Sequence, residues 1–311
     1  MQRKLRWKVK HMNPFKAGYV GLIGHPNAGK SSFLNQVVDE KVAAVTPKPQ
    51  TTRRRVLGIV TNEEAQIVFV DAPGLVKTST GINPFLQKEL QSVIKESDVL
   101  LAIVSLDTET PEMVDEILDM VAHQRKPWAV FINKTDLQEK AHRLGQIIEK
   151  ITTRKGRYFI GTCSHDEGVP KNDILDFCLE SLPENPGPLY DGEIYTPHTV
   201  RELTVEIVRE KCFTFLDKEL PYQLAVRIIK FEENEALPKI SFEILVSKET
   251  HKGIVIGKGG ETLKKIGIEA RKDIEKLLGS KVFIQFHVAI RPLWMKNAQM
   301  MEELGYVISA K

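Results

Sequence analysis

The feature that most restricts the fold of this chain is a glycine-rich segment near its beginning. Residues 24–31 read Gly-His-Pro-Asn-Ala-Gly-Lys-Ser and fit the pattern G-x-x-x-x-G-K-[ST]. An apolar, β-branched run at 19–23 comes directly before it, and a helical pattern at 31–37 follows. In that context a glycine-rich turn aims backbone N–H groups at phosphate, and the helix N-terminus adds its positive dipole end. The segment therefore predicts a phosphate-binding loop; a plain glycine-rich strand-to-helix turn is the alternative.

The residues that follow keep alternating between short apolar runs and helical patterns. Strands are predicted at 19–23, 55–61, 65–71, 99–105, 128–133 and 157–161. Helices are predicted near 31–37, 83–96, 111–123, 137–152 and 169–182. Such alternation needs crossover connections and gives a mainly parallel, doubly wound sheet. The strands at 55–61 and 65–71 are the exception, because so short a turn can only join antiparallel neighbours. The expected fold is α/β with one antiparallel edge strand.

Prolines and glycines mark the end of this domain. The segment 183–198 contains four prolines and two glycines, a density that neither helix nor strand tolerates. The pattern beyond it changes to a helix at 200–216, strands at 222–232 and 238–247, a short helix leading to Gly257, a helix at 260–278 and a strand at 281–289. We therefore expect an α/β domain at 18–182, a linker at 183–198 and a smaller α+β domain with a C-terminal tail at 199–311.

Composition excludes several classes of protein. With 42% hydrophobic and 27% charged residues the chain matches soluble globular proteins, not disordered or collagenous ones. No apolar run approaches the roughly 18 residues that a membrane-spanning helix needs. Three scattered cysteines, Cys163, Cys178 and Cys212, suit neither a disulfide framework nor a zinc site. They indicate a reducing compartment, and the cytoplasm is the expected location.

The charge is segregated along the chain. Residues 1–17 carry six Lys or Arg and no acidic residue, within an overall net charge of +3. A basic arm favours a polyanionic partner, although scattered lysines are also ordinary solvated surface. We expect this arm to be disordered or not native to the protein, residues 1–11 above all, since Met12 is a candidate start.

Two further segments would complete a nucleotide site. Within the glycine-rich loop, Lys30 would neutralise the β- and γ-phosphates and the Ser31 hydroxyl would bind Mg²⁺. Asp71 ends the third predicted strand, where a carboxylate can hold Mg²⁺, although Asp-Ala-Pro-Gly also suits an ordinary turn. Residues 133–136 follow the fifth predicted strand at the ligand-binding edge of such sheets. The Asp136 carboxylate can accept from two N–H groups of guanine that adenine lacks in that arrangement, which predicts GTP rather than ATP.

A second anion-binding turn lies in the C-terminal domain. Residues 254–260 read Ile-Val-Ile-Gly-Lys-Gly-Gly and precede a long amphipathic helix. A lone G-x-x-G is also a plain helix-to-helix turn. Here the order of elements, the apolar residues before the turn and the lysines near the helix start together resemble a KH domain, whose G-x-x-G loop clamps about four nucleotides of a single strand. The residues expected to contact RNA are Ile256, Gly257, Lys258, Gly259, Gly260, Lys264 and Lys265.

Together these motifs resemble the Era family of bacterial ribosome-assembly GTPases, over residues 18 to 307. The family joins a P-loop GTPase domain of the translation-factor class to a KH domain of the bacterial type. The resemblance implies that GTP and Mg²⁺ are the cofactors. The residues it implies for nucleotide binding are Gly24, His25, Pro26, Asn27, Ala28, Gly29, Lys30, Ser31, Ser32, Asp71, Ala72, Pro73, Gly74, Asn133, Lys134, Thr135, Asp136, Thr162, Cys163 and Ser164.

The resemblance also assigns roles. It implies Ser31, Thr52 and Asp71 as metal ligands, with Thr52 as the switch threonine that closes on Mg²⁺ when GTP is bound. It implies Lys30, Thr52 and Asn27 as the catalytic residues. Cys163 departs from the usual Ser-Ala loop but would still offer its backbone N–H to guanine O6. Ala72 replaces a threonine, which affects only a side-chain contact.

Hydrolysis is where the sequence departs most from well-known GTPases. Leu75 occupies the position where many GTPases carry a glutamine that orients water, and its side chain cannot bond water. In related GTPases with an apolar residue there, an asparagine that matches Asn27 helps to hold K⁺ against the β- and γ-phosphates. Asn27 could instead bond a switch loop or its own turn. The sequence leaves these readings open.

The function that the resemblance implies is a GTP-hydrolysing switch that binds single-stranded small-subunit ribosomal RNA and acts in small-subunit assembly. The alternative is an RNA-binding assembly factor that binds the nucleotide but hydrolyses it little. The resemblance implies the 3′ end of that RNA and the small subunit as partners, a monomer, and weak peripheral membrane contact. The end of the chain carries the family's Glu-Leu-Gly-Tyr segment up to Tyr306, whereas 291–295 departs from the usual pattern.

Overall fold

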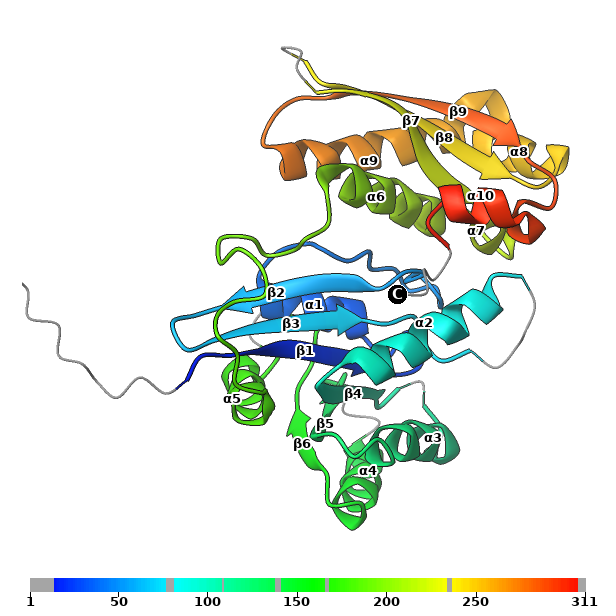
Figure 1. Ribbon diagram of the computed structural model, residues 1–311. Helices are drawn as coiled ribbons and strands as arrows, with labels where there is room; N and C mark the ends of the chain where they lie inside the picture. Colours follow the sequence, from blue (N-terminus) through cyan, green and yellow to red (C-terminus); the bar gives the residue numbers. More distant parts are fainter. Residues whose placement is uncertain are drawn as a thin grey trace, which may run out of the picture.

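The first sheet brings the predicted loops to one edge. The computed structural model describes residues 14–76, 81–107, 109–137, 141–165, 168–233 and 237–306. A six-stranded sheet has the order β2-β3-β1-β4-β5-β6 (Figure 1). Its strands are β1 (Lys16–Ile23), β2 (Val56–Thr61), β3 (Ala65–Asp71), β4 (Val99–Ser105), β5 (Trp128–Asn133) and β6 (Arg157–Ile160). β2 runs antiparallel to β3 and the other pairs are parallel, as the sequence predicted.

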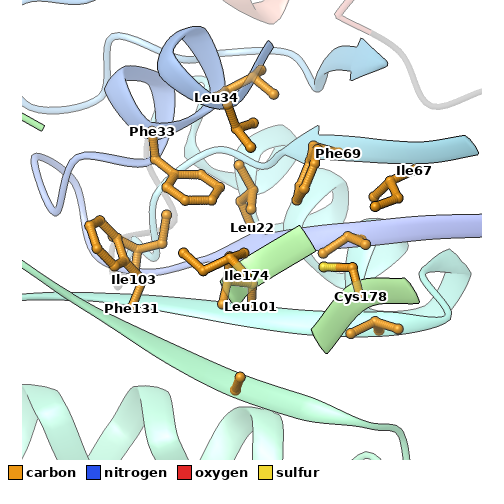
Figure 2. Packing of buried hydrophobic residues seen from close by; sticks show 14 of the residues in the cluster. Leu22, Phe33, Leu34, Ile67, Phe69, Leu101, Ile103, Phe131, Ile174 and Cys178 are labelled. Carbon is orange, nitrogen blue, oxygen red and sulfur yellow. The ribbon is translucent and has the colours of Figure 1, made fainter. Parts of the chain in front are cut away.

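Helices cover both faces of this sheet. They are α1 (Lys30–Val38), α2 (Asn83–Glu96), α3 (Pro111–Ala122), α4 (Ala141–Thr153) and α5 (Lys171–Ser181). Figure 2 shows the face under α1 and α5, where Phe33 of α1 and Ile174 of α5 pack against strand residues such as Phe69 and Phe131. The Phe33 ring lies 5.4 Å from that of Phe131 and 5.9 Å from that of Phe69, measured between centroids. This packing fixes α1, and therefore the loop before it, on the sheet.

The second domain has the predicted α+β pattern with additional short helices. Its helices are α6 (Val200–Phe215), α7 (Leu220–Gln223), α8 (Glu249–Ile256), α9 (Glu261–Leu278) and α10 (Ala298–Glu303), with 3₁₀ turns η2 (Lys258–Gly260) and η3 (Trp294–Lys296). Strands β7 (Ala225–Glu232), β8 (Lys239–Val246) and β9 (Phe283–Ile290) form the sheet β7-β8-β9. β7 and β8 are antiparallel, and β8 and β9 are parallel. A capping box between Thr199 and Glu202 begins α6.

Several predicted boundaries were wrong, for identifiable reasons. β1 begins at Lys16, inside the expected arm, because its backbone continues to pair with β3 as far as Ala65. The helix expected from 137 is not helical at Leu137, and residues 138–140 lie outside the described part of the chain. β7 begins at Ala225 instead of 222, because the preceding residues form α7. The expected arm residues 1–13 and tail residues 307–311 also lie outside the described part.

The linker segment lies against the first domain along β2 and β3. The backbone N–H of Ile59 donates to the Tyr195 carbonyl at 2.8 Å, and the Gln66 side chain donates to the Tyr190 carbonyl at 2.9 Å. The Thr196 hydroxyl donates to the Leu57 carbonyl at 2.7 Å. Residues 183–198 contain no helix or strand, and besides these bonds Glu184 forms an isolated antiparallel bridge with Lys16 of β1. The segment is therefore irregular but held in place, since its polar groups bond the edge of the sheet.

A hydrophobic cluster joins the two domains. Val76, Ile82 and Phe85 of the first domain pack with Trp294 and Tyr306 of the second. Trp294 is fully buried, and its indole N–H donates to the Gln223 carbonyl at 2.9 Å. The Phe85 and Tyr306 rings meet edge to face with centroids 5.7 Å apart. The two domains consequently share buried apolar surface next to the segment that follows Gly74.

Candidate functional site

The predicted nucleotide residues come together around one cavity of 580 Å³ at the edge of the six-stranded sheet. The predicted residues that line it are Pro26, Asn27, Gly29, Lys30, Ser31, Ser32, Thr52, Gly74, Asn133, Lys134, Asp136, Thr162, Cys163 and Ser164. They come from five separate loops, which follow β1, α1, β3, β5 and β6 and meet at one edge of the sheet. The cavity has the size of a small-molecule or cofactor site.

The glycine-rich loop has a backbone that other residues could not adopt easily. Gly29 ends the loop with φ of 103°, and a Cβ there would lie 2.0 Å from Nδ2 of Asn133. Asn133 Nδ2 in turn donates to the Ala28 carbonyl at 2.8 Å. The Asn133 side chain therefore holds the loop in place, and α1 begins directly after the loop at Lys30. This is the geometry that offers backbone N–H groups to phosphate.

The Lys30 side chain is buried and extends toward the first residues of the glycine-rich loop. Its ammonium donates to the carbonyls of Gly24 at 3.2 Å and His25 at 3.0 Å. Burial lowers the pKa of Lys30, while the charges of Asp71 and Glu109 act in the opposite direction. A buried ammonium with two neutral acceptors is well placed to bind a phosphate, because an anion would restore the solvation that burial removes.

Three side chains that could coordinate a metal through oxygen, Ser31, Thr52 and Asp71, lie close together near Lys30. The Ser31 hydroxyl lies 2.5 Å from Asp71 Oδ2 and 2.9 Å from the Thr52 hydroxyl, and Thr52 Oγ1 lies 3.1 Å from the same Asp71 oxygen. Burial raises the pKa of Asp71, against the effects of Lys30 and the two hydroxyls. Its other oxygen, Oδ1, is buried and has no hydrogen-bond partner among the described residues. One carboxylate and two hydroxyls are donors that Mg²⁺ prefers, so the set fits that ion.

Residues 133–136, where guanine recognition is predicted, are held by side-chain bonds. Lys134 Nζ lies 3.0 Å from both carboxylate oxygens of Asp107, which also lines the cavity. The Ser164 hydroxyl donates to Asp136 Oδ2 at 3.1 Å. Hydrogen bonding from the Thr162 side chain holds the pKa of Asp136 below its ordinary value. Asp136 is therefore a carboxylate at neutral pH and can accept two hydrogen bonds from a base.

At Cys163 the backbone N–H, and not the thiol, is the group that can take part in binding. Burial raises the pKa of the thiol to about 12, so it is not a nucleophile at neutral pH. Its N–H donates to Asn133 Oδ1 at 3.0 Å in this structure. The donor expected to face guanine O6 is thus directed at the Asn133 side chain.

Other predicted residues support the cavity without lining it. They are Gly24, His25, Ala28, Asp71, Ala72, Pro73 and Thr135. His25 is 3% exposed and its ring lies 3.1 Å from the Met113 carbonyl, away from the cavity. The Thr135 hydroxyl donates to the Gly161 carbonyl at 2.9 Å and so shapes the adjoining loop.

Sequence reasoning missed part of the lining. The missed residues are Ala44, Val45, Thr46, Pro47, Gln50, Thr51, Asp107 and Leu137. Asp107 could have been found, because it follows β4 at the same carboxyl edge as Asn133. Residues 44–51 carry no motif that distinguishes them from an ordinary polar loop.

The structure shows the contacts of Asn27 and Leu75, the two residues on which the predictions about hydrolysis depend. Asn27 has φ of 64°, and its side-chain amide donates to the Pro47 carbonyl at 2.8 Å. Asn27 therefore bonds the loop that carries Thr52, which is one of the open readings of this residue. Leu75 packs against the core on the α2 side of the sheet, and its N–H donates to the Gly24 carbonyl at 3.2 Å. Its side chain offers no polar group to water.

The G-x-x-G turn of the second domain is open to solvent. Gly257 has φ of 78°, and a Cβ there would lie 2.3 Å from the Thr262 hydroxyl. Cβ atoms at Gly259 and Gly260 would meet nothing within 4 Å, so another molecule can approach this backbone closely. The turn lies directly before α9. A helix N-terminus with open glycines suits a phosphate of a nucleic-acid backbone.

Lysines surround this turn. Lys258, Lys264 and Lys265 are exposed, and none has an ion-pair partner within the residues that the structure describes. Ile256 is half-buried at the end of α8, while Ile254 on the same helix is 55% exposed. An apolar side chain beside unpaired lysines can contact both the bases and the phosphates of a single strand.

Comparison with known proteins gives two matching family models. Residues 19–134 match the model described as 50S ribosome-binding GTPase, and residues 219–294 match a KH domain. GTPase Era of Geobacter metallireducens is 39% identical over 300 residues, covering 94% of this chain and 99% of its own length. GTPase Era of Coxiella burnetii is 34% identical and covers 95% of this chain and 99% of its own.

Solved structures agree over the same extent. A variant of Era from Aquifex aeolicus bound to GDP·AlF4⁻ has 31% identity and a TM-score of 0.87, covering 94% of this chain and all of its own. Era in complex with MgGDPNP and nucleotides 1506–1542 of 16S ribosomal RNA matches with the same identity, TM-score and coverage. Since both domains match over nearly the full length of these relatives, the chain belongs to the Era family of GTPases.

Proposed function

We propose that this GTPase binds the single-stranded 3′ end of small-subunit ribosomal RNA at its G-x-x-G turn and acts in small-subunit assembly under control of GTP. The observation that carries the proposal is the presence, in one chain, of a cavity lined by the glycine-rich loop and residues 133–136 and of an open G-x-x-G turn surrounded by lysines. The relative solved with 16S ribosomal RNA supports the identity of the partner. That relative matches both domains, whereas the family model described as 50S ribosome-binding GTPase matches only residues 19–134. We therefore propose the small subunit as the partner instead of the large one.

Within the cavity we assign the residues as follows. Backbone N–H groups of the loop 24–31 and the ammonium of Lys30 hold the phosphates, and Asp136 selects guanine. Ser31, Thr52 and Asp71 hold Mg²⁺, which when bound would neutralise charge on the β- and γ-phosphates. The convergence of their oxygens within 3.1 Å supports this assignment.

The slow-hydrolysis alternative concerns rate, not the type of reaction. Leu75 cannot orient the attacking water, so the structure favours a low intrinsic rate that a partner raises. Steady-state GTP turnover with and without small ribosomal subunits measures this. Stimulation by the subunits supports a switch, whereas equal low turnover in both samples would favour the RNA-binding factor.

The RNA partner has its own experiment. Ultraviolet crosslinking of the full chain to cellular RNA, followed by sequencing of the bound fragments, should place the footprint at the 3′ end of small-subunit RNA. A variant with Lys258→Asp and Gly259→Asp is the control, because it should lose the footprint while still binding GTP. A footprint on large-subunit RNA would contradict the proposal.

The remaining assignments concern ions, assembly and location. We extend the proposal to K⁺ beside the β- and γ-phosphates near Asn27, a monomer and a cytoplasmic location. The free cysteines Cys163, Cys178 and Cys212 support a reducing compartment. No helix in the described ranges is both long and apolar enough to cross a bilayer. Weak peripheral membrane contact rests on the resemblance alone, and co-sedimentation with anionic vesicles tests it.

A further inference from the structure

Arg53 joins the nucleotide-binding loop to the second domain. It directly follows Thr52, yet its side chain is only 2% exposed and lies among residues of the other domain. Nη1 donates to the Leu224 carbonyl at 2.7 Å, and Nη2 donates to the Pro221 and Tyr222 carbonyls at 2.9 Å each. The guanidinium also lies over the ring of Phe213 of α6, 5.6 Å from its centroid.

The preceding residue faces the metal-binding oxygens. The Thr52 hydroxyl lies 2.9 Å from Ser31 Oγ and 3.1 Å from Asp71 Oδ2. Two consecutive residues therefore connect different domains: Thr52 to the nucleotide site and Arg53 to α6 and the α7–β7 junction. A shift of the Arg53 backbone cannot leave the Thr52 hydroxyl in place, because one peptide unit joins them.

Other contacts hold this loop at positions further from Thr52. Asn35 bonds the backbone of Val42 and Ala43, and Arg55 pairs with Glu89 at 3.2 Å. Residues 39–55 contain no helix or strand, so no hydrogen-bonded ladder holds their backbone. Lys48 bonds the Leu216 carbonyl and Asp217, but Asp217 is 86% exposed. Lys41 is 43% exposed and pairs with Glu210 and Asp273 at 2.9 Å. Lys41 and Lys48 are partly exposed and lie at least four residues from Thr52. Arg53 is adjacent to Thr52, and its buried guanidinium with three carbonyl acceptors is costly to displace.

We propose that Arg53 is a positioning residue through which the second domain holds Thr52 in its metal-binding position and so strengthens the binding of GTP over GDP. The inference rests on the metal role proposed for Thr52. We call the loop 39–55 closed when the Thr52 hydroxyl lies beside Ser31 and Asp71, as it does here. If only a fraction of molecules has the closed loop, the apparent dissociation constant for GTP rises in inverse proportion to that fraction. Arg53 keeps the fraction high. GDP, which lacks the γ-phosphate and does not need the closed loop, gains little from it.

The experiment compares nucleotide preference in full-length variants. Arg53→Gln removes the charge and most donors, Arg53→Lys keeps the charge but loses the planar fork, and Arg54→Gln is the matched control. Arg54 is 45% exposed, and its ion pair with Glu202 is 4.0 Å long. Affinities for fluorescent GTP and GDP analogues are measured by titration over a range of Mg²⁺ concentrations.

Arg53→Gln should lower the GTP to GDP affinity ratio about tenfold or more, as expected when the competent fraction falls by that factor. It should also raise the Mg²⁺ concentration needed for GTP binding, with GDP affinity nearly unchanged. The affinity ratio of Arg53→Lys should lie between those of Arg53→Gln and the unchanged protein. If Arg53→Gln does not fold, the ratio of Arg53→Lys tests the proposal in its place. Arg54→Gln should retain the original ratio. A folded Arg53 variant with a lower melting temperature but an unchanged ratio would overturn the proposal, since Arg53 would then be merely structural.

A double-mutant cycle separates this inference from the role of Thr52. If Arg53 acts through Thr52, Arg53→Gln should have little further effect on the ratio once Thr52→Ala is present. Fully additive effects would overturn the inference while leaving Thr52 as a metal ligand. An unchanged Mg²⁺ dependence in Thr52→Ala alone would overturn both.

Discussion

The Ser31 hydroxyl donates to Oδ2 of Asp71 at 2.5 Å, which ties the first turn of α1 to the end of β3. The other Asp71 oxygen is buried without a partner in the described part of the chain. A carboxylate held this way is already oriented by the protein and retains the capacity to bind a cation. The pair therefore marks the side of the cavity where we propose that Mg²⁺ binds.

Replacing Asp71 with Asn tests this metal side. The amide keeps an acceptor for Ser31 but loses the charge that attracts a cation, so the Mg²⁺ concentration for half-maximal GTP hydrolysis should rise about tenfold or more. Nucleotide binding without Mg²⁺ should change little. Asp173→Asn, at an exposed position of α5, is the control for charge. If Asp71→Asn has the Mg²⁺ dependence of the control, Asp71 is not part of the metal site.

The proposed role of Asp136 is to select the base. Asp136→Asn replaces a double acceptor with a group that cannot pair equally with both guanine donors. GTP affinity should fall by about 1–3 kcal/mol for each charged bond lost, and xanthosine triphosphate should bind better than before. Titration with both nucleotides measures the change, with Asp191→Asn on the exposed linker as control. Unchanged preference for GTP would remove Asp136 from the base site.

Dependence on K⁺ is the prediction for Asn27. Turnover should rise when Na⁺ is replaced by K⁺ at constant ionic strength, since a cation beside the β- and γ-phosphates stabilises charge in the transition state. Asn27→Ala should abolish the rise. If the bond to Pro47 is instead the whole role of Asn27, the variant should weaken GTP binding equally in both salts. Equal turnover of the unchanged protein in the two salts would exclude a K⁺ site.

Separation of the two binding sites can be tested with charge variants. Lys258→Asp with Gly259→Asp should weaken binding of a short single-stranded RNA at all salt concentrations, because carboxylates replace the groups that phosphate approaches. GTP affinity should change little, since neither residue lies at the domain junction. Lys276→Asp with Ser280→Asp makes the same charge change at the far end of α9 and is the control.

Conversely, Lys30→Ala should remove nucleotide binding and leave RNA affinity, measured without nucleotide, intact. Fluorescence anisotropy measures RNA binding, and normal binding by the variant with Lys258→Asp and Gly259→Asp would refute the KH assignment.

Stability should depend on pH through Glu109. This residue is 1% exposed, accepts from the Ser105 N–H at 3.3 Å, and has its pKa raised by burial from 4.5 to about 8. The folded state therefore holds one more proton than the unfolded state between these values, and the free energy of unfolding falls as pH rises through this window. Glu109→Gln mimics the protonated form. Its stability relative to the unchanged protein should be similar near pH 4.5 and should increase toward pH 8, by at most about 1.4 kcal/mol per pH unit. Urea unfolding at several pH values measures this, with exposed Glu63→Gln as control; parallel curves for both variants would contradict the prediction.

The sequence by itself determined the order of the strands and helices, the antiparallel edge and the two anion-binding turns. These features are local. The turn before α1 joins a strand to a helix and the turn before α9 joins two helices, and in both cases the glycines and the short-range pattern around them are enough to predict the turn. Lys30, Asp71 and Asp136 could be assigned together because the carboxyl ends of parallel strands must meet at one edge. The sequence did not determine α7 or α10, which are short and have no periodic pattern of their own.

Only the tertiary structure decided how the two domains meet. Arg53 has the appearance of one more basic residue in a polar loop, and its burial depends on carbonyls at 221–224 that lie far away in sequence. Trp294 and Tyr306 likewise find Phe85 across the domain junction. The sequence pattern of each segment is compatible with a solvated surface. What makes these residues interior is contact with the other domain, and such contacts depend on the complete fold because burial is a property of the assembled surfaces and not of local sequence.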